Sequence, residues 1–381
     1  MAKKKIFHII TKLELGGAQK NTLMTLELLP RGLYDLGLIS GCDGPMDEDA
    51  ERLPDVRVYW VPSMVREVRA WKDLKTLWKL YSVMRRERPD IIHTHSSKAG
   101  ILGRWAAWAA GVPVIIHTAH GFGFNDRQRA LVRGFYVWLE RATYYVTTRF
   151  VVVSLSNART GEAYRIFKTG QWVLCRSAIS LDEFMVPAPR RASLAEWGID
   201  PNKIVVGMVA CFKPQKSPVA FVEVAAGVLR ERDDVHFVMI GDGELREEIE
   251  DKIAESGIGT DITLLGWRRD MPEVYRNLDV LVLTSLWEGL PRVFAEAMAN
   301  QLPIVATNVD GASEAVIDGK TGYLHQPHDI EGMTRSVLRL VSAPEERRSM
   351  GEEGRSRVVE FEIGTSQSRL EETYRECLAA L

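Results

Sequence analysis

The sequence has few cysteines and no long uninterrupted apolar run. Its four cysteines are scattered without CxxC spacing, at Cys42, Cys175, Cys211 and Cys377. This pattern argues against a disulfide framework or a zinc knuckle and is typical of a reducing cytosol. No stretch approaches the roughly 18 apolar residues of a transmembrane helix, and the apolar run near the N-terminus is too short for a signal peptide. We therefore expect a cytoplasmic chain without a membrane span.

A dinucleotide-binding fingerprint is also missing. Lys5–Thr11 is predicted to form the first strand, and Leu15-Gly16-Gly17-Ala18 then opens a helix through Leu29. The glycine spacing is not G-x-G-x-x-G. Paired glycines at such a turn let the backbone approach a phosphate closely, although a glycine turn is often only a turn.

Composition and length indicate an ordinary globular protein of two domains. The 381 residues are 46% hydrophobic and 26% charged, with a net charge of −2. The charge is uneven, because the first 185 residues are net positive and the rest are net negative. A basic N-terminal half suggests an acidic partner or a membrane surface, and chance asymmetry between two domains is the alternative.

Short apolar runs alternate with helical patterns along both halves, which predicts an α/β fold with two doubly wound parallel sheets. Residues 1–185 form the expected N-terminal domain, and 203–361 the expected C-terminal domain. Between them, VPAPRRASLAEWGIDP has the proline and polar content of a linker, assigned to 186–202. Residues 362–381 are predicted to end the chain as a helix.

The most informative stretch is TSLWEGLPRVFAEAMANQLPIVATNVDG, residues 284–311. It follows a buried strand, Asp279–Leu283, and contains a tight turn and a helix at Val293–Ala299. Pro291 suits the first turn of that helix, whose N-terminus favours an anion such as a diphosphate. Glu288 and Glu296 could each bind neighbouring hydroxyls of a sugar. The alternative is that both are solvated helix-end residues.

Glu288-x7-Glu296, followed by LPIVATNVDGASEAVIDGKTGYL, resembles the donor-site signature of the retaining family 4 glycosyltransferases. The resemblance implies two facing Rossmann-like domains, the GT-B arrangement, with a nucleotide sugar between them. It implies that Glu296 contacts the ribose and Glu288 the transferred sugar. It also implies that the C-terminal helix crosses back onto an acceptor-binding first domain.

The same resemblance implies further site residues. His120, at a strand end, belongs to the reaction centre, and Lys216 neutralises the leaving diphosphate, although by itself it could be a surface lysine. The family usually has a Gly-Arg pair where this chain has Ala210 and Cys211, so Lys213 or Arg292 would have to replace the arginine. The donor-binding set is then Gly16, Gly17, Lys213, Gly266, Trp267, Gly289, Leu290, Pro291 and Glu296.

Histidines follow two neighbouring expected strands, in His93-Thr94-His95 and His117-Thr118-Ala119-His120. Ligands of open α/β sheets bind at such strand ends. A zinc site is the rival interpretation, but only Asp126 is nearby to complete a ligand shell. We expect no metal and no other cofactor.

Two helical segments of the basic half combine aromatic and basic residues, Val68–Arg88 and Asp126–Arg149. In the first, one face carries an apolar stripe expected to pack on the sheet, formed by Trp71, Leu74, Leu77, Trp78, Tyr81 and Met84. The opposite face, expected to point outward, carries Lys72, Lys75, Lys79 and Arg86. Outward basic residues favour an anionic membrane, whereas an ordinary solvated face is the alternative.

The resemblance implies a retaining glycosyltransferase that moves a hexose from a UDP- or GDP-sugar. The expected acceptor is lipid-linked or a polysaccharide, at the inner face of the cytoplasmic membrane, with no nucleic-acid partner. A soluble small-molecule glycosyltransferase and a GT-B nucleotide-sugar epimerase are the alternatives, because fold does not fix function. A metallohydrolase built on the histidines is a further one.

Overall fold

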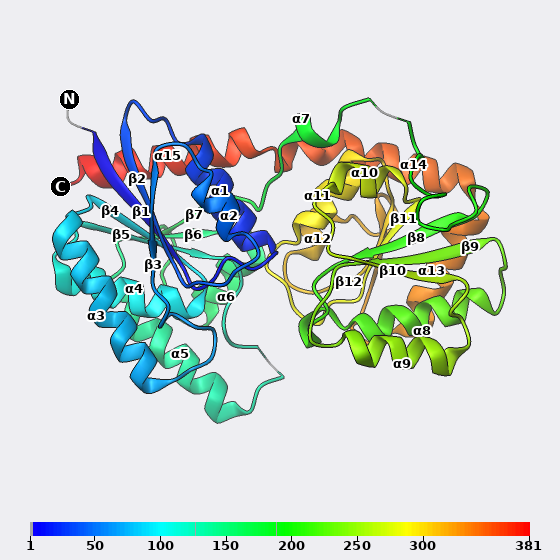
Figure 1. Cartoon of the computed structure of the whole chain (residues 1–381), viewed down its shortest axis with the longest axis horizontal. Helices are drawn as coiled ribbons and strands as arrows, with labels where there is room; N and C mark the ends of the chain where they lie inside the picture. The colour runs from blue at the N-terminus through cyan, green and yellow to red at the C-terminus, as the bar shows by residue number, and fades with distance from the viewer. Residues whose placement is uncertain (1–2, 126, 188) are drawn as a thin grey trace. The chain divides into compact units, whose positions relative to one another are not determined.

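The computed structural model describes residues 3–125, 127–187 and 189–381 (Figure 1). The chain divides into two compact units. The first contains the residues up to Ser177 together with Gly364–Leu381, and the second is Ala178–Ile363. The segment 186–202 therefore falls within the second unit, where Arg191 Nη1 contacts Asp279 Oδ2 at 3.0 Å.

The first unit is built on a seven-stranded parallel sheet of order β3-β2-β1-β4-β5-β6-β7. The order reverses between β1 and β4, which is the switch point beside which open α/β sheets bind ligands. Its strands are β1 (Lys4–Ile10), β2 (Tyr34–Ser40), β3 (Val56–Trp60), β4 (Ile91–His95), β5 (Val114–Ala119), β6 (Arg149–Val152) and β7 (Trp172–Leu174).

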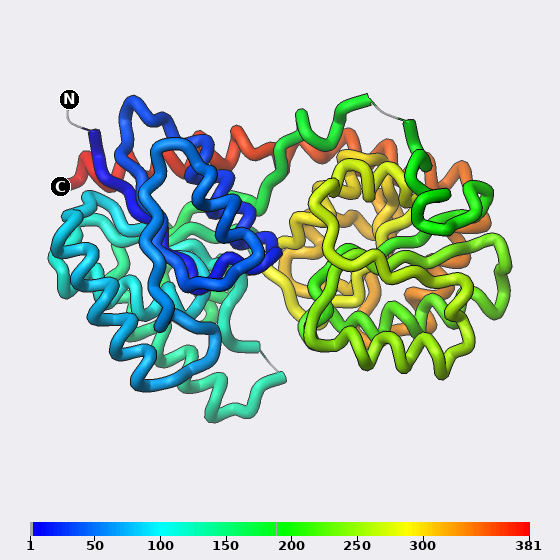
Figure 2. Tube along the Cα trace, viewed as in Figure 1, coloured from blue at the N-terminus to red at the C-terminus, as the bar shows by residue number. Residues whose placement is uncertain are grey.

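Helices cover both faces of this sheet (Figure 1). On one face, α3 and α4 bury residues such as Leu80 and Ala106 against Phe7 and Ile92. On the other, α1 and α15 from the two ends of the chain lie side by side, as the trace in Figure 2 shows. The helices are α1 (Gly17–Leu28), α2 (Asp47–Glu51), α3 (Ala70–Glu87), α4 (Ser97–Ala110), α5 (Ala130–Tyr144), α6 (Leu155–Ala163) and α15 (Ile363–Ala379).

The second unit repeats the plan with a six-stranded parallel sheet, β10-β9-β8-β11-β12-β13. Its strands are β8 (Ile204–Val209), β9 (Val235–Ile240), β10 (Ile262–Gly266), β11 (Val280–Leu283), β12 (Ile304–Thr307) and β13 (Gly322–His325). Its helices are α7 (Leu181–Phe184), η1 (Pro214–Lys216), α8 (Pro218–Leu229), α9 (Arg246–Ser256), α10 (Met271–Arg276), α11 (Arg292–Ala299), α12 (Ala312–Ala315), α13 (Ile330–Ser342), α14 (Pro344–Arg357) and η2 (Val358–Phe361). Two doubly wound parallel sheets confirm the predicted fold class.

The prediction for the apolar stripe of α3 was largely wrong. Trp71 is 86% exposed and Trp78 67% exposed, and Leu74 and Tyr81 are exposed as well, so only Met84 and part of Leu77 pack inward. The buried face is instead Thr76, Leu80, Val83 and Met84. Thr76 can occupy it because its hydroxyl donates a hydrogen bond to Ser63 Oγ at 2.8 Å. The basic residues of this helix do point outward, as expected.

Candidate functional site

In the second unit, Lys216 and Glu288 meet at the carboxyl ends of β8 and β11. These adjacent strands flank the point where the sheet order reverses. The Lys216 ammonium forms an ion pair with Glu288 Oε1, and the side chains are only 17% and 7% exposed. Ser285 Oγ donates to the same carboxylate oxygen at 2.6 Å. Two residues 72 positions apart are thus one polar cluster at a ligand-binding edge.

Backbone contacts between the two loops hold this pair in place. Leu286 N–H donates to Gln215 C=O at 2.7 Å, and the Gln215 side chain donates to Trp287 C=O at 2.9 Å. Thr284 Oγ1 donates to the Ser217 carbonyl at 2.8 Å. The backbone N–H of Glu288 donates to Asp310 Oδ2 at 2.6 Å. These contacts therefore fix the position of the Glu288 carboxylate from several sides.

Glu296 lies on α11 and is almost fully buried. Tyr275 donates its hydroxyl proton to Glu296 Oε2 at 2.8 Å, and Arg292 Nε lies 3.7 Å from Glu296 Oε1. Burial, and then the Glu296 charge, raise the pKa of Tyr275 well above its usual value. Burial lowers the pKa of Arg292, although the nearby carboxylates oppose that change. Glu296 is thus an anchored carboxylate rather than a solvated helix end.

The remaining residues predicted in this unit lie in the turn between β11 and α11 and at the end of β10. Pro291 is the N-cap residue of α11, one position earlier than expected, and Leu290 is buried. Gly266 ends β10 with φ +65°, and Trp267 beyond it is 45% exposed. Gly311 N–H donates to Gly289 C=O at 3.1 Å, which ties the turn to the following loop.

The loop after β8 carries the departure from the family pattern. Cys211 is partly buried, and Lys213 N–H donates to its carbonyl at 2.9 Å. Gly241, with φ +132°, lies against this loop, because an added Cβ would come within 1.8 Å of Ala210 O. A glycine is therefore required there to let the two loops approach each other.

In the first unit, polar side chains collect on one face of the sheet. Alternation along a strand has a period of two, so His8, His93, His95 and Thr118 share the face that α15 covers. In the pairing register, His8 is opposite His93 and His95 is opposite Thr118. His120 follows β5 on that face, with Nε2 3.0 Å from His95 Nδ1.

Burial keeps these histidines neutral. It lowers the pKa of His8 to about 3 and that of His120 to about 4. Burial is also the main cause that holds the pKa values of His93 and His95 well below the usual value. Neutral imidazoles offer one donor and one acceptor nitrogen each, which suits a hydrogen-bonded chain.

Gly16 and His117 complete the predicted residues of this unit. Gly16 is the N-cap residue of α1, with extended φ −157°, and Gly17 begins the helix after β1. His117 points to the opposite face and bonds Thr94 Oγ1 at 2.9 Å, so it does not join the other histidines.

In the part of the chain that the structure describes, ligand atoms gather closely enough for a metal ion at a different set of histidines from the predicted one. Among the described residues, ligand atoms of His8, His93 and His95 lie within 4.8 Å of one another. Each of their six ring nitrogens already has a hydrogen-bond partner. A metal ion would have to displace those partners. Asp126, the expected extra ligand, lies outside the described residues.

Sequence reasoning missed several side chains that hold the site residues. Tyr374 lies 281 residues from His93, yet its hydroxyl is 2.5 Å from His93 Nδ1. Tyr275 and Ser285 anchor the two glutamates. Only Ser285 carried a local signal, because it lies three residues before Glu288 in the same turn.

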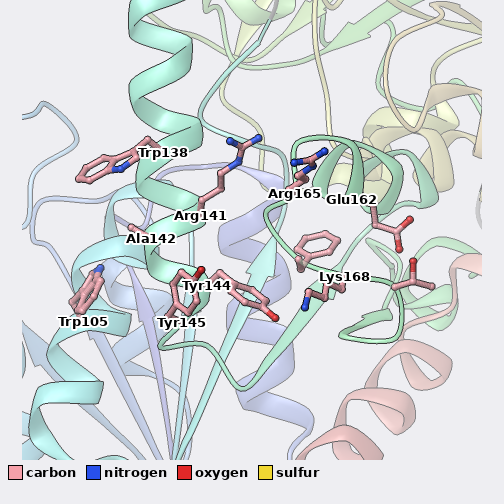
Figure 3. A pocket seen from close by; sticks show the side chains of 11 residues that line it. Trp105, Trp138, Arg141, Ala142, Tyr144, Tyr145, Glu162, Arg165 and Lys168 are labelled. Atoms are coloured by element: carbon pink, nitrogen blue, oxygen red, sulfur yellow. The ribbon is translucent and has the colours of Figure 1, made fainter.

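The first unit also has a surface pocket of about 780 Å³ at the C-terminal end of α5 (Figure 3). Trp138 and Arg141 line it from α5, and Arg165 and Lys168 line it from the segment after α6. It is lined by Trp105, Trp138, Arg141, Ala142, Tyr144, Tyr145, Glu162, Arg165, Phe167, Lys168 and Thr169. It lies where β6 and β7 begin, so it is at the opposite edge of the sheet from His120.

Two family models match the chain. Residues 16–167 match the glycosyl transferase 4-like domain, and residues 189–357 match the glycosyl transferases group 1 domain. Each match falls within one of the two halves described above.

Similar proteins agree with these matches. The chain is 34% identical over 344 residues to an Escherichia coli UDP-Gal:alpha-D-GlcNAc-diphosphoundecaprenol alpha-1,3-galactosyltransferase, covering 89% of this chain and 88% of that protein. It is 23% identical to the Staphylococcus aureus capsular polysaccharide biosynthesis glycosyltransferase CapM, covering 94% and 93%.

A solved structure of Anabaena Alr3699/HepE in complex with UDP and glucose has a TM-score of 0.82 to this chain. It is 18% identical and covers 98% of this chain and all of that one. The sucrose-phosphate synthase of Thermosynechococcus elongatus has a TM-score of 0.84 at 21% identity, with full coverage of both chains. At these identities the likeness shows the fold.

Proposed function

Because the chain belongs to the family 4, group 1 glycosyltransferases, we propose that it transfers a hexose from a UDP-sugar to a lipid-linked glycan, with retention of configuration. The Lys216–Glu288 pair at the switch point of the second sheet carries this proposal. It puts a cation and a carboxylate side by side where a sugar diphosphate would have its reactive bond.

Lys216 would serve the leaving group. When the bond between the sugar C1 and the diphosphate oxygen breaks, negative charge grows on the diphosphate, which a preorganised cation stabilises. Lys216 would turn from Glu288 to the diphosphate, and the N-terminus of α11 would add its partial positive charge. This arrangement needs no metal ion for that charge.

Glu288, freed from the ammonium but still held by Ser285, would accept hydrogen bonds from sugar hydroxyls. Glu296 would hold the ribose, because Tyr275 and Arg292 fix its carboxylate. The acceptor hydroxyl would then attack C1 on the face that the diphosphate leaves, and its proton would pass to a departing phosphate oxygen.

The proposed donor and acceptor are taken from the substrates of a similar protein. The Escherichia coli protein is named as using UDP-Gal and a diphosphoundecaprenol-linked GlcNAc. UDP-galactose and a polyprenyl-diphosphate-GlcNAc are therefore the first pair to test, with other UDP-hexoses and a GDP-hexose as comparisons. Donor binding should raise the unfolding temperature of the chain in a thermal-shift screen.

The decisive experiment measures UDP release and glycolipid formation together, followed by NMR of the new anomeric centre. Equal UDP release and product with an α-linkage from an α-donor supports the proposal. UDP release without an acceptor product would indicate hydrolysis or epimerisation instead. Loss of activity on chelation would contradict the metal-independent mechanism.

We propose further that the first unit associates with an anionic membrane. No helix among the described residues has both the length and the hydropathy to cross a bilayer. The outer surface of α3 and α5 nevertheless exposes large apolar side chains beside basic ones, namely Trp71, Leu74, Trp78, Leu131, Phe135 and Trp138. Aromatic rings beside Lys72, Lys75 and Lys79 suit the headgroup layer.

The pocket in Figure 3 adds to this surface, because it places Arg141, Arg165 and Lys168 beside Trp138 and Tyr145. Sedimentation with vesicles of anionic or neutral lipid at low and high salt tests the association. We expect binding to anionic vesicles that weakens in high salt. Equal binding to both lipids, or binding to neither, would favour a soluble acceptor.

A further inference from the structure

A continuous hydrogen-bonded chain runs through the first unit to His120. Thr118 Oγ1 lies 2.6 Å from His93 Nε2, and His93 Nδ1 lies 2.5 Å from the Tyr374 hydroxyl. That hydroxyl lies 3.2 Å from His8 Nε2, and His8 Nδ1 lies 2.9 Å from His95 Nε2. The chain ends where His95 Nδ1 meets His120 Nε2 at 3.0 Å.

Every member of this hydrogen-bonded chain except His120 is buried. Each of its hydrogen bonds therefore requires one proton between the two atoms that it joins. The five bonds link six neutral groups, each of which brings one exchangeable proton. Each neutral imidazole can donate from one nitrogen only. An imidazole that accepts a hydrogen bond from one neighbour on one nitrogen therefore donates to the next neighbour from the other nitrogen. The direction of donation is therefore shared along the whole chain.

Donation away from Thr118 satisfies all members. The Thr118 hydroxyl donates to His93, His93 to Tyr374, Tyr374 to His8, His8 to His95, and His95 Nδ1–H to His120 Nε2. The sixth proton is then on His120 Nδ1. Because His120 is partly exposed, that N–H can reach water or a ligand.

The reverse direction leaves a buried donor without an acceptor. The Thr118 hydroxyl would accept from His93, and its own proton would have no other partner among the described residues. A chain in which Tyr374 accepts from both sides would instead leave the hydroxyl proton of Tyr374 unpartnered, and Tyr374 is 0% exposed. Unsatisfied buried donors are rare in folded proteins because they are costly.

We propose that Tyr374, His8 and His95 are positioning residues that hold His120 in its Nδ1–H tautomer. His120 then offers a bound sugar a hydrogen-bond donor and does not act as a general base. Its role in transfer rests on the proposed function, whereas the tautomer does not. The C-terminal helix α15 thus contributes to the site, because it supplies Tyr374.

The test is long-range ¹H–¹⁵N NMR of the full chain labelled at histidine, which reports which ring nitrogen carries the proton. The wild type should show His120 protonated at Nδ1 alone. Tyr374→Phe removes the hydroxyl that links His93 to His8, so both His120 tautomers should appear. In the transfer assay, we expect kcat to fall roughly two- to tenfold, in proportion to the lost tautomer, with little change in the donor KM.

Matched variants separate this effect from simple damage to the core. Tyr34 is also buried in the core under α15, but it lies outside the chain, so Tyr34→Phe should leave the His120 tautomer unchanged. Thr118→Val should mix the tautomers, and Thr118→Ser should restore Nδ1–H, because serine keeps the donor.

An Nε2–H form of His120 in the wild type would overturn the proposal, and so would an unchanged tautomer in both Tyr374→Phe and Thr118→Val. If the tautomers respond as expected but the wild type transfers no sugar, the proposed function fails while this inference stands.

Discussion

Glu296 shows at the residue scale how a motif residue depends on a partner that the motif does not contain, Tyr275. Its carboxylate is held by the Tyr275 hydroxyl at 2.8 Å and lies 3.7 Å from Arg292 Nε. Truncation to alanine would remove the carboxylate that lies 3.7 Å from the buried Arg292 guanidinium, and breaking a buried ion pair typically costs about 3–5 kcal/mol of stability. Glu296→Gln keeps the size and tests the charge.

We expect Glu296→Gln to raise the dissociation constant for UDP roughly tenfold or more. A charge-assisted hydrogen bond contributes about 1.5–3 kcal/mol, and the amide loses much of that to ribose hydroxyls. Calorimetric titration with UDP measures the change, and Glu288→Gln is the comparison, because that residue is proposed to bind the transferred sugar and not the ribose. Unchanged UDP affinity in a folded Glu296→Gln protein would exclude the ribose role.

The second prediction at the residue scale concerns Lys216, which pairs with Glu288. Lys216→Ala removes the cation proposed for the leaving diphosphate, so kcat should fall roughly 10²-fold or more. Lys216→Arg retains the charge and should keep more of the activity. Steady-state kinetics distinguish the two, and equal kcat values for wild type and Lys216→Ala would exclude this role.

A related prediction concerns Cys211, which stands where the family usually has an arginine. If Lys213 partly replaces that charge, Lys213→Ala should lower kcat measurably, but by less than Lys216→Ala. Cys211→Arg would restore the family pattern and serves as the comparison. A silent Lys213→Ala, together with faster turnover of Cys211→Arg, would mean that the site works with one positive charge fewer.

At the scale of elements, α3 and α5 each bury polar as well as apolar side chains and leave aromatic rings outward. α5 is fastened to α4 by the buried Arg104–Glu140 ion pair at 2.7 Å and by the bond from Trp105 Nε1 to Thr143 Oγ1 at 3.1 Å. The buried face of this helix therefore combines Val137 with Glu140 and Thr143. Phe135 and Trp138 remain outside, with their stacked ring centroids 6.2 Å apart.

Two substitutions on α3 separate core from surface. Trp78→Ser should change the free energy of unfolding by less than about 0.5 kcal/mol, because the ring is 67% exposed. Leu80→Ala, two residues along, should cost about 2–5 kcal/mol, because Leu80 is fully buried. Urea unfolding measures both. We expect only Trp78→Ser to weaken sedimentation with anionic vesicles, and a large stability loss in Trp78→Ser would contradict this assignment.

At the scale of the whole molecule, the parallel sheets and the motif turn could be predicted, because they follow from local patterns. Apolar runs such as Val280–Leu283 mark buried strands, and Glu288 and Glu296 lie within one short segment. The spacing His93-x-His95 also places both histidines on one face. What could not be predicted is what covers that face, since Tyr374 comes from a helix 281 residues away. Likewise, the burial of Thr76 on α3 involves a hydrogen bond to Ser63, which lies outside the helix and could not be predicted from the helical pattern.

The buried histidines should make the stability of the first unit depend on pH. Burial holds the pKa values of His8, His93, His95, His117 and His120 below the ordinary value, to about 3 for His8 and about 4 for His120. In the unfolded chain the same histidines take up protons near pH ~6.5. The unfolded state therefore binds more protons below that pH, and the folded state loses stability as the pH falls.

Each such histidine contributes up to about 1.4 kcal/mol per pH unit, so five together change stability by as much as ~7 kcal/mol per unit. Since whole domains have only about 5–15 kcal/mol, we expect acid unfolding of the first unit near pH ~5 and full stability above pH ~7. Urea titrations followed by near-UV circular dichroism at several pH values measure the slope. His117→Gln, outside the hydrogen-bonded chain, should reduce the slope by about one proton, and its own stability at about pH 8 is the reference for any packing cost. A free energy of unfolding that stays constant as the pH falls from about 7 to 5 would mean that these histidines accept protons in the folded state.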